Sequence, residues 1–260
     1  MKKKVSGSAL VPFAPVADLT KLDPEIQVLI DANAAALSGG GGWPMISTRG
    51  GVFSVGDIET ESFTGVVLDA CRTNIYYDPN IPYNPQLTES PLCYAIGDAE
   101  ENLAPPAELK TRQADKCAGC IQNAFGSAPG RKGKACKNYL SLAVLDITGQ
   151  TLSPELFEKR QGYLLRVNPT SKGAVQAELK SVLAAGVPLP YATIEFECAP
   201  DKKTQIAVTA TKRSIITGPK VRAAICERIA AARTELRRPM GTKDHPTAVP
   251  QTAVVRRKRA

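Results

Sequence analysis

Residues 117–138 read CAGCIQNAFGSAPGRKGKACKN, and this stretch decides how the middle of the chain can fold. It is too polar and too glycine-rich to order itself by packing apolar side chains. Cys117 and Cys120 form a CxxC pair, Cys136 follows after fifteen intervening residues, and Cys93 precedes the pair by twenty-three. Four thiolates at about 2.3 Å suit tetrahedral zinc, and metal binding can contribute on the order of 10 kcal/mol to folding. We therefore expect a structural Zn²⁺ held by these four cysteines.

Other assignments of the cysteines stay open at this point. Cys71 is the rival of Cys93, but it lies in the middle of an expected strand, whereas Cys93 follows a proline in a loop-like segment. A redox CxxC pair would require a βαβ context that the flanking sequence lacks, and an iron–sulfur cluster could use the same ligands. Cys71, Cys198 and Cys226 are expected to be small apolar residues of the core.

The composition favours a polyanionic partner and a reducing compartment. The 260 residues carry a formal net charge of +8 and include seven cysteines, an odd number that suits a disulfide framework poorly. No run of about 18 apolar residues predicts a membrane span, and prolines interrupt the segment after the basic start, so no signal peptide is expected. We expect a cytoplasmic protein, in the bacterial host if it is phage-encoded.

The chain is expected to be mainly β with α additions. Residues 1–42 form an N-terminal arm with a short helix at about 23–37. Residues 43–218 form the core, with the zinc-binding insertion at about 78–138. Residues 219–238 form a C-terminal helix, and 239–260 a basic disordered tail. Strands and one further helix within the core are predicted from periodicity at 51–55, 63–77, 139–148, 162–167, 191–198 and 204–212 (strands) and at 170–185 (helix).

Catalysis is not expected. The chain has one histidine, His245, in the expected tail, which removes most acid–base and triad chemistry. Four thiolates leave a zinc ion no open position, and the segment around Lys134 lacks the Ser or Thr of a phosphate-binding loop. A metal-dependent nuclease using Asp57, Glu59 and Asp69 remains an alternative.

Aromatic and basic residues gather in and near the zinc-binding insertion, a combination that is typical of single-stranded nucleic-acid binding. The expected contact residues are Trp43, Arg72, Tyr76, Tyr77, Phe125, Arg131, Lys132, Lys134 and Lys137. Each also has a plainer interpretation. Trp43 can be a core residue, Tyr76 and Tyr77 must point to opposite sides of a strand, and the lysines can simply solvate the loop.

Several short motifs occur in a familiar order: a Trp-Pro start, Asn74-Ile75-Tyr76-Tyr77, Pro91-x-Cys93, Cys117-x-x-Cys120 and Gly133-Lys134-x-Cys136-Lys137-Asn138. This order resembles a group of phage and mobile-element proteins found with replication and recombination genes, over roughly residues 43–212. The resemblance implies single-stranded DNA binding, with replication or recombination proteins as further partners. By a looser analogy with zinc-containing single-strand-binding proteins of T-even phages, it implies an OB-like Greek-key barrel with an inserted zinc loop.

The basic C-terminal end departs from that interpretation, and one alternative function stands beside it. Many single-strand-binding proteins end in an acidic tail that recruits partners, whereas this chain ends in Arg256-Arg257-Lys258-Arg259. A zinc-stabilised protein-interaction factor, such as a transcription or recombination adaptor, is the main alternative function.

Overall fold

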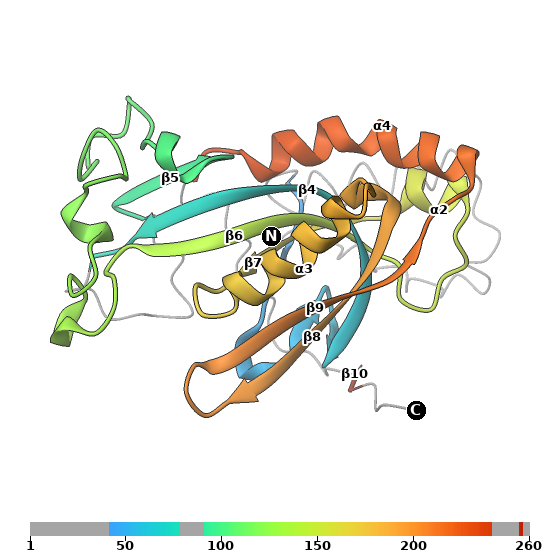
Figure 1. Cartoon of the computed structure of the whole chain (residues 1–260), viewed down its shortest axis with the longest axis horizontal. Coiled ribbons are helices and arrows are strands. Elements are labelled where there is room, and N and C mark those ends of the chain that lie inside the picture. Colours follow the sequence, from blue (N-terminus) through green and yellow to red (C-terminus); the bar gives the residue numbers. More distant parts are fainter. Residues whose placement is uncertain (1–41, 79–90, 241–254, 257–260) are drawn as a thin grey trace, which may run out of the picture. The chain divides into compact units, whose positions relative to one another are not determined.

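The longest strand, β4 (Ser62–Tyr76), is the axis of the main sheet (Figure 1). Strand β6 (Lys137–Asp146) pairs with it along one side. On the other side, β8 (Ala192–Asp201) pairs with the first part of β4 and β5 (Cys93–Gly97) with the last part. All these pairings are antiparallel. β4 thus pairs with three strands, and its C-terminal end lies between β5 and β6.

This computed structural model describes residues 42–78, 91–240 and 255–256, all within the unit Gly42–Ala260. The expected arm and helix at 1–41, and the tail apart from its start and residues 255–256, lie outside the described residues. The remaining strands are β1 (Met45–Ile46), β2 (Phe53–Val55), β3 (Ile58–Thr60), β7 (Gly162–Val167), β9 (Gln205–Ile215) and β10 (Val255–Arg256). The helices are α2 (Pro154–Lys159), α3 (Lys172–Ala184) and α4 (Pro219–Leu236).

Helices cover the main sheet on both faces. Along β6, Leu142 and Val144 belong to the core that includes α3, whereas Ala143 and Leu145 belong to the core that includes α2 and α4. Successive side chains of a strand point to opposite faces, so this alternation places α3 on one face and α2 with α4 on the other. None of the described helices has the length and apolarity needed to cross a membrane.

The mainly β architecture with α additions is confirmed, but the expected Greek-key barrel is not closed. Among the described residues the sheet runs β1-β7-β6-β4-β8-β9, and its end strands β1 and β9 do not pair with each other. The pairing of β1 with β7 is parallel, so the sheet is mixed. The physical reason is that the strands bury apolar residues on both faces, which calls for a covering layer of helices on each side.

Most predicted elements are confirmed to within a few residues. The strand expected at 63–77 is β4, that at 162–167 is β7, and the helix expected at 170–185 is α3. Sequence reasoning missed β5, because it treated 78–138 as irregular. The short 3-10 helices are η2 (Arg49–Gly51), η3 (Glu100–Asn102), η4 (Ile121–Asn123), η5 (Pro129–Arg131) and η6 (Leu189–Tyr191).

Candidate metal centre and its basic loop

The end of β4 gathers the first and last of the four predicted cysteine ligands. Tyr76 pairs with Cys93, the first residue of β5, and Ile75 pairs with Lys137, the residue after Cys136. Two strands that join β4 from opposite sides therefore bring Cys93 and Cys136, which are far apart in sequence, to the same end of the sheet.

Backbone hydrogen bonds fix the CxxC pair at the same place. The Cys117 N–H donates to the Leu103 carbonyl at 2.8 Å, and the Cys136 N–H donates to the Gln122 carbonyl at 2.8 Å. Between the two cysteines of the pair, Gly119 has a φ of +81°, a backbone conformation that favours glycine. The tight turn and the two long-range bonds hold the residues around Cys120 against those before β6.

All four cysteines line one cavity of about 20 Å³, enough for a single water or ion. Asn74, Tyr76, Tyr94, Ala95, Gln113, Gln122 and Asn123 complete its lining. Cys71 is not among the lining residues; it is buried in the core beneath α4, with its Sγ 3.9 Å from the Leu236 carbonyl. The structure thus places together the set with Cys93, and it leaves Cys71 elsewhere.

Burial and mutual proximity raise the pKa values of Cys93, Cys117 and Cys136. Burial raises the pKa of Cys136 to about 12, and the thiols of Cys117, Cys120 and Cys93 add to this. Burial likewise raises the pKa of Cys93 and of Cys117, with Cys120 contributing to both. Close thiols disfavour each other's ionisation. A bound divalent cation would stabilise their thiolate forms, since a metal deprotonates its thiol ligands.

A buried amide beside the cavity fits a metal–thiolate centre. Asn74 Nδ2 is buried and has no hydrogen-bond partner of normal geometry among the described residues. It is aimed at Cys117, whose pKa it lowers against the larger opposing effect of burial. A donor without an oxygen or nitrogen acceptor is costly unless it bonds something, and a thiolate sulfur bound to zinc would serve.

The four thiols are not yet at metal-ligand spacing. Among the described residues, no group of three or more His, Cys, Asp or Glu side chains is already arranged to hold a metal ion. Coordination therefore requires the cysteine side chains to turn toward the centre of the cavity that they line. The chemistry of the donor set, four thiols in one small cavity with a buried amide beside them, fits zinc.

The loop between Cys120 and Cys136, which we call the basic loop, exposes two apolar side chains. Phe125 is 83% exposed and Ile121 is 74% exposed. Lys132 of the loop is also exposed, as is Lys137, which follows the loop at the start of β6. The Lys134 ammonium donates to Asn123 Oδ1 at 3.2 Å. The Gly126 N–H donates to the Gly133 carbonyl at 2.8 Å, which closes the loop beneath these side chains. The side chain of Arg131 lies outside the described residues.

The other predicted contact residues lie outside the basic loop. Tyr76 is buried and lines the cysteine cavity, whereas Tyr77 is 40% exposed. Arg72 forms an ion pair with Glu100 at 3.0 Å. Trp43 packs flat against Gly162, where even a Cβ atom would collide with the indole ring. The structure thus gathers Phe125 and the lysines, and it does not bring Trp43 or Tyr76 to them.

The three carboxylates considered for a nuclease do not form one group. Asp69 in β4 forms ion pairs with Arg233 and Arg237 of the α4 region. Asp57 directly precedes β3 and Glu59 lies within it, and β3 belongs to the second sheet. Asp69 therefore lies on a different sheet from Asp57 and Glu59.

Sequence reasoning missed Asn74 as a member of the metal centre. A signal was present, because asparagine is uncommon inside strands and Asn74 interrupts a run of strand-forming residues. Its role depends on the pairing of β4 with β6, which the sequence did not reveal.

Comparisons with protein-family models, with curated proteins and with solved structures find no match to this chain.

Proposed function

We propose that this chain is a non-catalytic single-stranded DNA-binding protein whose basic loop is shaped by one structural zinc ion. One observation carries the proposal: the loop between Cys120 and Cys136 presents Phe125, 83% exposed, together with the exposed Lys132, and the exposed Lys137 follows at the start of β6. An aromatic ring so open to water contributes nothing to the core, and it is available to stack on a base.

Stacking and charge act together in such a loop. An aromatic side chain that stacks on an unpaired base contributes about 1–3 kcal/mol, whatever the base. Lys132 and Lys137 are placed to neutralise phosphates and release counterions, a contribution that weakens with salt. Duplex DNA hides the faces of its bases, so the same loop would favour single strands.

Zinc would act by fixing the loop. The polar stretch from Ile121 to Ala135 is tied to the sheet mainly through the residues next to its cysteines. A tetrahedral thiolate centre would lock Cys117, Cys120, Cys136 and Cys93 together and hold Phe125 outward. The lysines would also offset the negative charge of zinc bound by four thiolates.

The proposal does not require the OB-like topology that the sequence suggested. Single-stranded nucleic acid is bound by open sheets as well as by barrels. The resemblance to phage and mobile-element proteins supports a role in replication or recombination, in the cytoplasm of a bacterial host, with the proteins of those processes as partners.

Fluorescence anisotropy of a labelled single strand and of the matching duplex, at several salt concentrations, tests the proposal. We expect tighter binding to the single strand, and a loss of roughly 5- to 150-fold on Phe125→Ala. Leu183→Ala is the matched control, because Leu183 is an exposed apolar residue of α3, 51% exposed. Equal affinity for duplex, or no loss with Phe125→Ala, would count against DNA binding by this loop.

Ile121 favours a second candidate, a protein-interaction adaptor. An aliphatic side chain that is 74% exposed has no base-stacking role, but it can anchor a protein partner in a pocket. Capture of replication or recombination proteins that persists after nuclease treatment and is lost with Ile121→Ala would support this function instead.

A further inference from the structure

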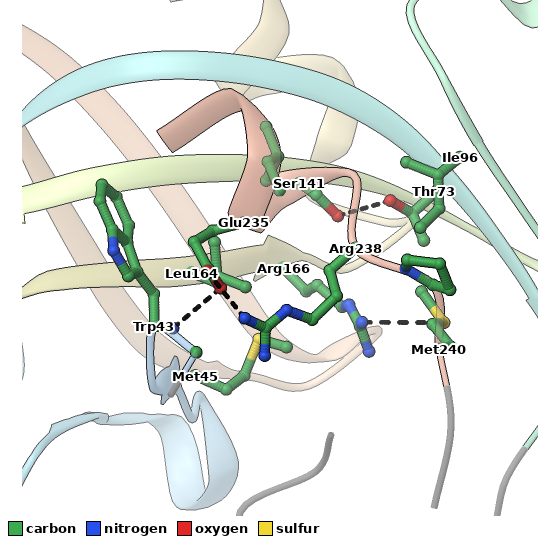
Figure 2. Close-up of a pocket in the computed structure, with 13 residues that line it drawn as sticks. Trp43, Met45, Thr73, Ile96, Ser141, Leu164, Arg166, Glu235, Arg238 and Met240 are labelled. Carbon is green, nitrogen blue, oxygen red and sulfur yellow. Dashed lines mark hydrogen bonds and ion pairs between the residues drawn. The ribbon is translucent and has the colours of Figure 1, made fainter. Parts of the chain in front are cut away.

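A second cavity, of about 60 Å³, lies between the C-terminal end of α4 and the strands of the main sheet (Figure 2). Its lining comes from the residues before β1, from β1, β4, β5, β6 and β7, and from the last turn of α4 with the residues just after it. The volume is several times what one water needs, so a tetrahedral oxyanion can enter.

Arg166 brings a positive charge into this cavity without a carboxylate to balance it. The residue lies on β7, directly across from Ser141 on β6, and is half-buried. Its guanidinium donates to Met240 Sδ at 3.9 Å, and a thioether sulfur is a weak acceptor. No Asp or Glu oxygen of the described residues forms an ion pair with it, whereas the half-buried Arg160 and Arg237 each hold an aspartate.

The ionisable groups that raise the pKa of Arg166 are the phenols of Tyr77 and Tyr139 and the thiol of Cys71, all three neutral at physiological pH. Burial lowers the pKa of Arg166, yet a guanidinium stays protonated in proteins, so the charge remains and its desolvation is uncompensated. An anion in the cavity would remove that cost.

The rest of the lining is suited to an anion. Glu235 is the carboxylate in the lining. It already accepts from the backbone N–H of Trp43 at 3.2 Å and from the Arg238 guanidinium at 2.9 Å. Two arginines against one glutamate leave the lining with a net positive charge. Above them, the buried hydroxyls of Thr73 and Ser141 lie 2.8 Å apart, and Thr73 Oγ1 also lies 3.8 Å from Cys71 Sγ. When Thr73 donates to Ser141, the Ser141 proton can be donated to a ligand in the cavity. Figure 2 shows the two guanidinium groups and this hydroxyl pair around the same space.

We propose that this cavity binds a phosphate group, with Arg166 as the principal ligand and the Thr73–Ser141 hydroxyl pair as a further donor. The phosphate can come from free inorganic phosphate or from a nucleic acid. The site is separate from the basic loop, since none of its lining residues belongs to the loop or to the cysteine cavity. A test of this site is therefore independent of whether Phe125 stacks on a base.

Calorimetric titration of the full chain with inorganic phosphate, at constant ionic strength set by chloride, tests the site. We expect saturable binding by the wild type and at least a tenfold loss with Arg166→Met. Arg213→Met is the matched control, because Arg213 is an exposed arginine on β9 that pairs with Glu195. Ser141→Ala serves as a second variant if Arg166→Met does not fold, and removing one hydroxyl should weaken binding about 2- to 10-fold.

A second arm separates the two sources of phosphate. If a nucleic acid supplies the group, Arg166→Met but not Arg213→Met weakens the binding of a single-stranded oligonucleotide, and added inorganic phosphate competes with that oligonucleotide. If free phosphate is the ligand, titration with phosphate succeeds and oligonucleotide affinity is the same in all variants. The proposal is overturned if the wild type binds neither ligand through Arg166. Loss of oligonucleotide binding with Phe125→Ala alone would still support the basic loop.

Discussion

The side-chain amide of Asn138 donates a 2.6 Å hydrogen bond to the side-chain oxygen of Asn74, its partner across the β4–β6 ladder. Both residues are buried, and Asn74 lines the cavity of the four cysteines. The bond fixes the orientation of the Asn74 amide, so its nitrogen faces Cys117. The pairing of β4 with β6 thus orients the Asn74 amide, held by Asn138, toward the candidate metal centre.

Replacing Asn74 with alanine should weaken zinc binding by about 10- to 100-fold, the usual effect of removing an outer-shell donor. The reason is that the Cys117 thiolate loses a hydrogen bond that stabilises its charged form. Competition with a chromophoric zinc chelator measures the affinity. Asn102→Ala is the control, because Asn102 is exposed on η3 and is not part of the cavity. Equal affinity in the two variants would remove Asn74 from the centre.

Thiol reactivity should divide the seven cysteines into three groups. Burial raises the pKa of Cys71 and of Cys198 to about 11, so at pH 8 only about one thiol in a thousand is ionised. These two should resist alkylation, and the exposed Cys226 should react first. The four cavity cysteines should react only after a chelator removes zinc. Mass spectrometry of the alkylated chain measures the pattern, and rapid labelling of Cys120 without chelator would contradict it.

The same two buried thiols give a pH dependence. Their folded pKa lies above the unfolded value, so the folded chain keeps protons that the unfolded chain releases. Their contribution to stability is complete below about pH 9 and is lost as pH rises toward 11. Urea unfolding of Cys198→Ala should therefore show a shallower loss of stability over that range than the wild type does. An identical slope would refute the assignment.

Trp43 and Phe125 should separate stability from binding. Trp43→Ala should lower the free energy of unfolding by roughly 3 kcal/mol, because the indole fills the space over Gly162 and lies 5.7 Å from the Arg228 guanidinium. The loss of DNA affinity caused by Phe125→Ala should be the same in the Trp43→Ala background, because Trp43 is not part of the basic loop. Phe125→Ala itself should leave the free energy of unfolding unchanged, since its ring is 83% exposed. Urea unfolding and anisotropy together test the pair, and a smaller effect of Phe125→Ala in the folded Trp43→Ala background would contradict it.

Each exposed lysine of the basic loop should contribute to the salt dependence of DNA binding. Lys132→Gln should reduce the slope of log affinity against log salt concentration by about 0.7, the value for one phosphate contact on a single strand. Lys202→Gln, an exposed lysine in the β8–β9 turn, should leave the slope unchanged. Equal slopes in both variants would place the DNA elsewhere.

Periodicity was enough to predict the elements that pack the core. The helix expected at 170–185 is α3, whose Val175, Leu179 and Val182 are buried as the apolar stripe predicts, although Leu183 is exposed. The strand predicted at 162–167 is β7, with its bounds unchanged. Local sequence carries such information, since these elements are defined by neighbours a few residues away.

Long-range pairing was not predictable from the same signals. Strand β5 is five residues long within a proline-rich segment, and among the described strands it pairs with β4 alone. The run Val66-Val67-Leu68 is buried throughout, which indicates a strand covered on both faces, but the family resemblance favoured a barrel. The four cysteines grouped as candidate ligands from the sequence line one cavity, whereas Asn74 and Arg166 reach their sites through cross-strand register.

The central claim is that Cys93, Cys117, Cys120 and Cys136 hold one zinc ion. Metal analysis of the purified chain by mass spectrometry tests it most directly, with Cys120→Ser compared with Cys226→Ser, a cysteine exposed on α4 and outside the cavity. We predict one zinc per chain in the wild type and in Cys226→Ser, and a large loss in Cys120→Ser. A wild type without bound metal, or the same zinc content in both variants, would contradict the claim.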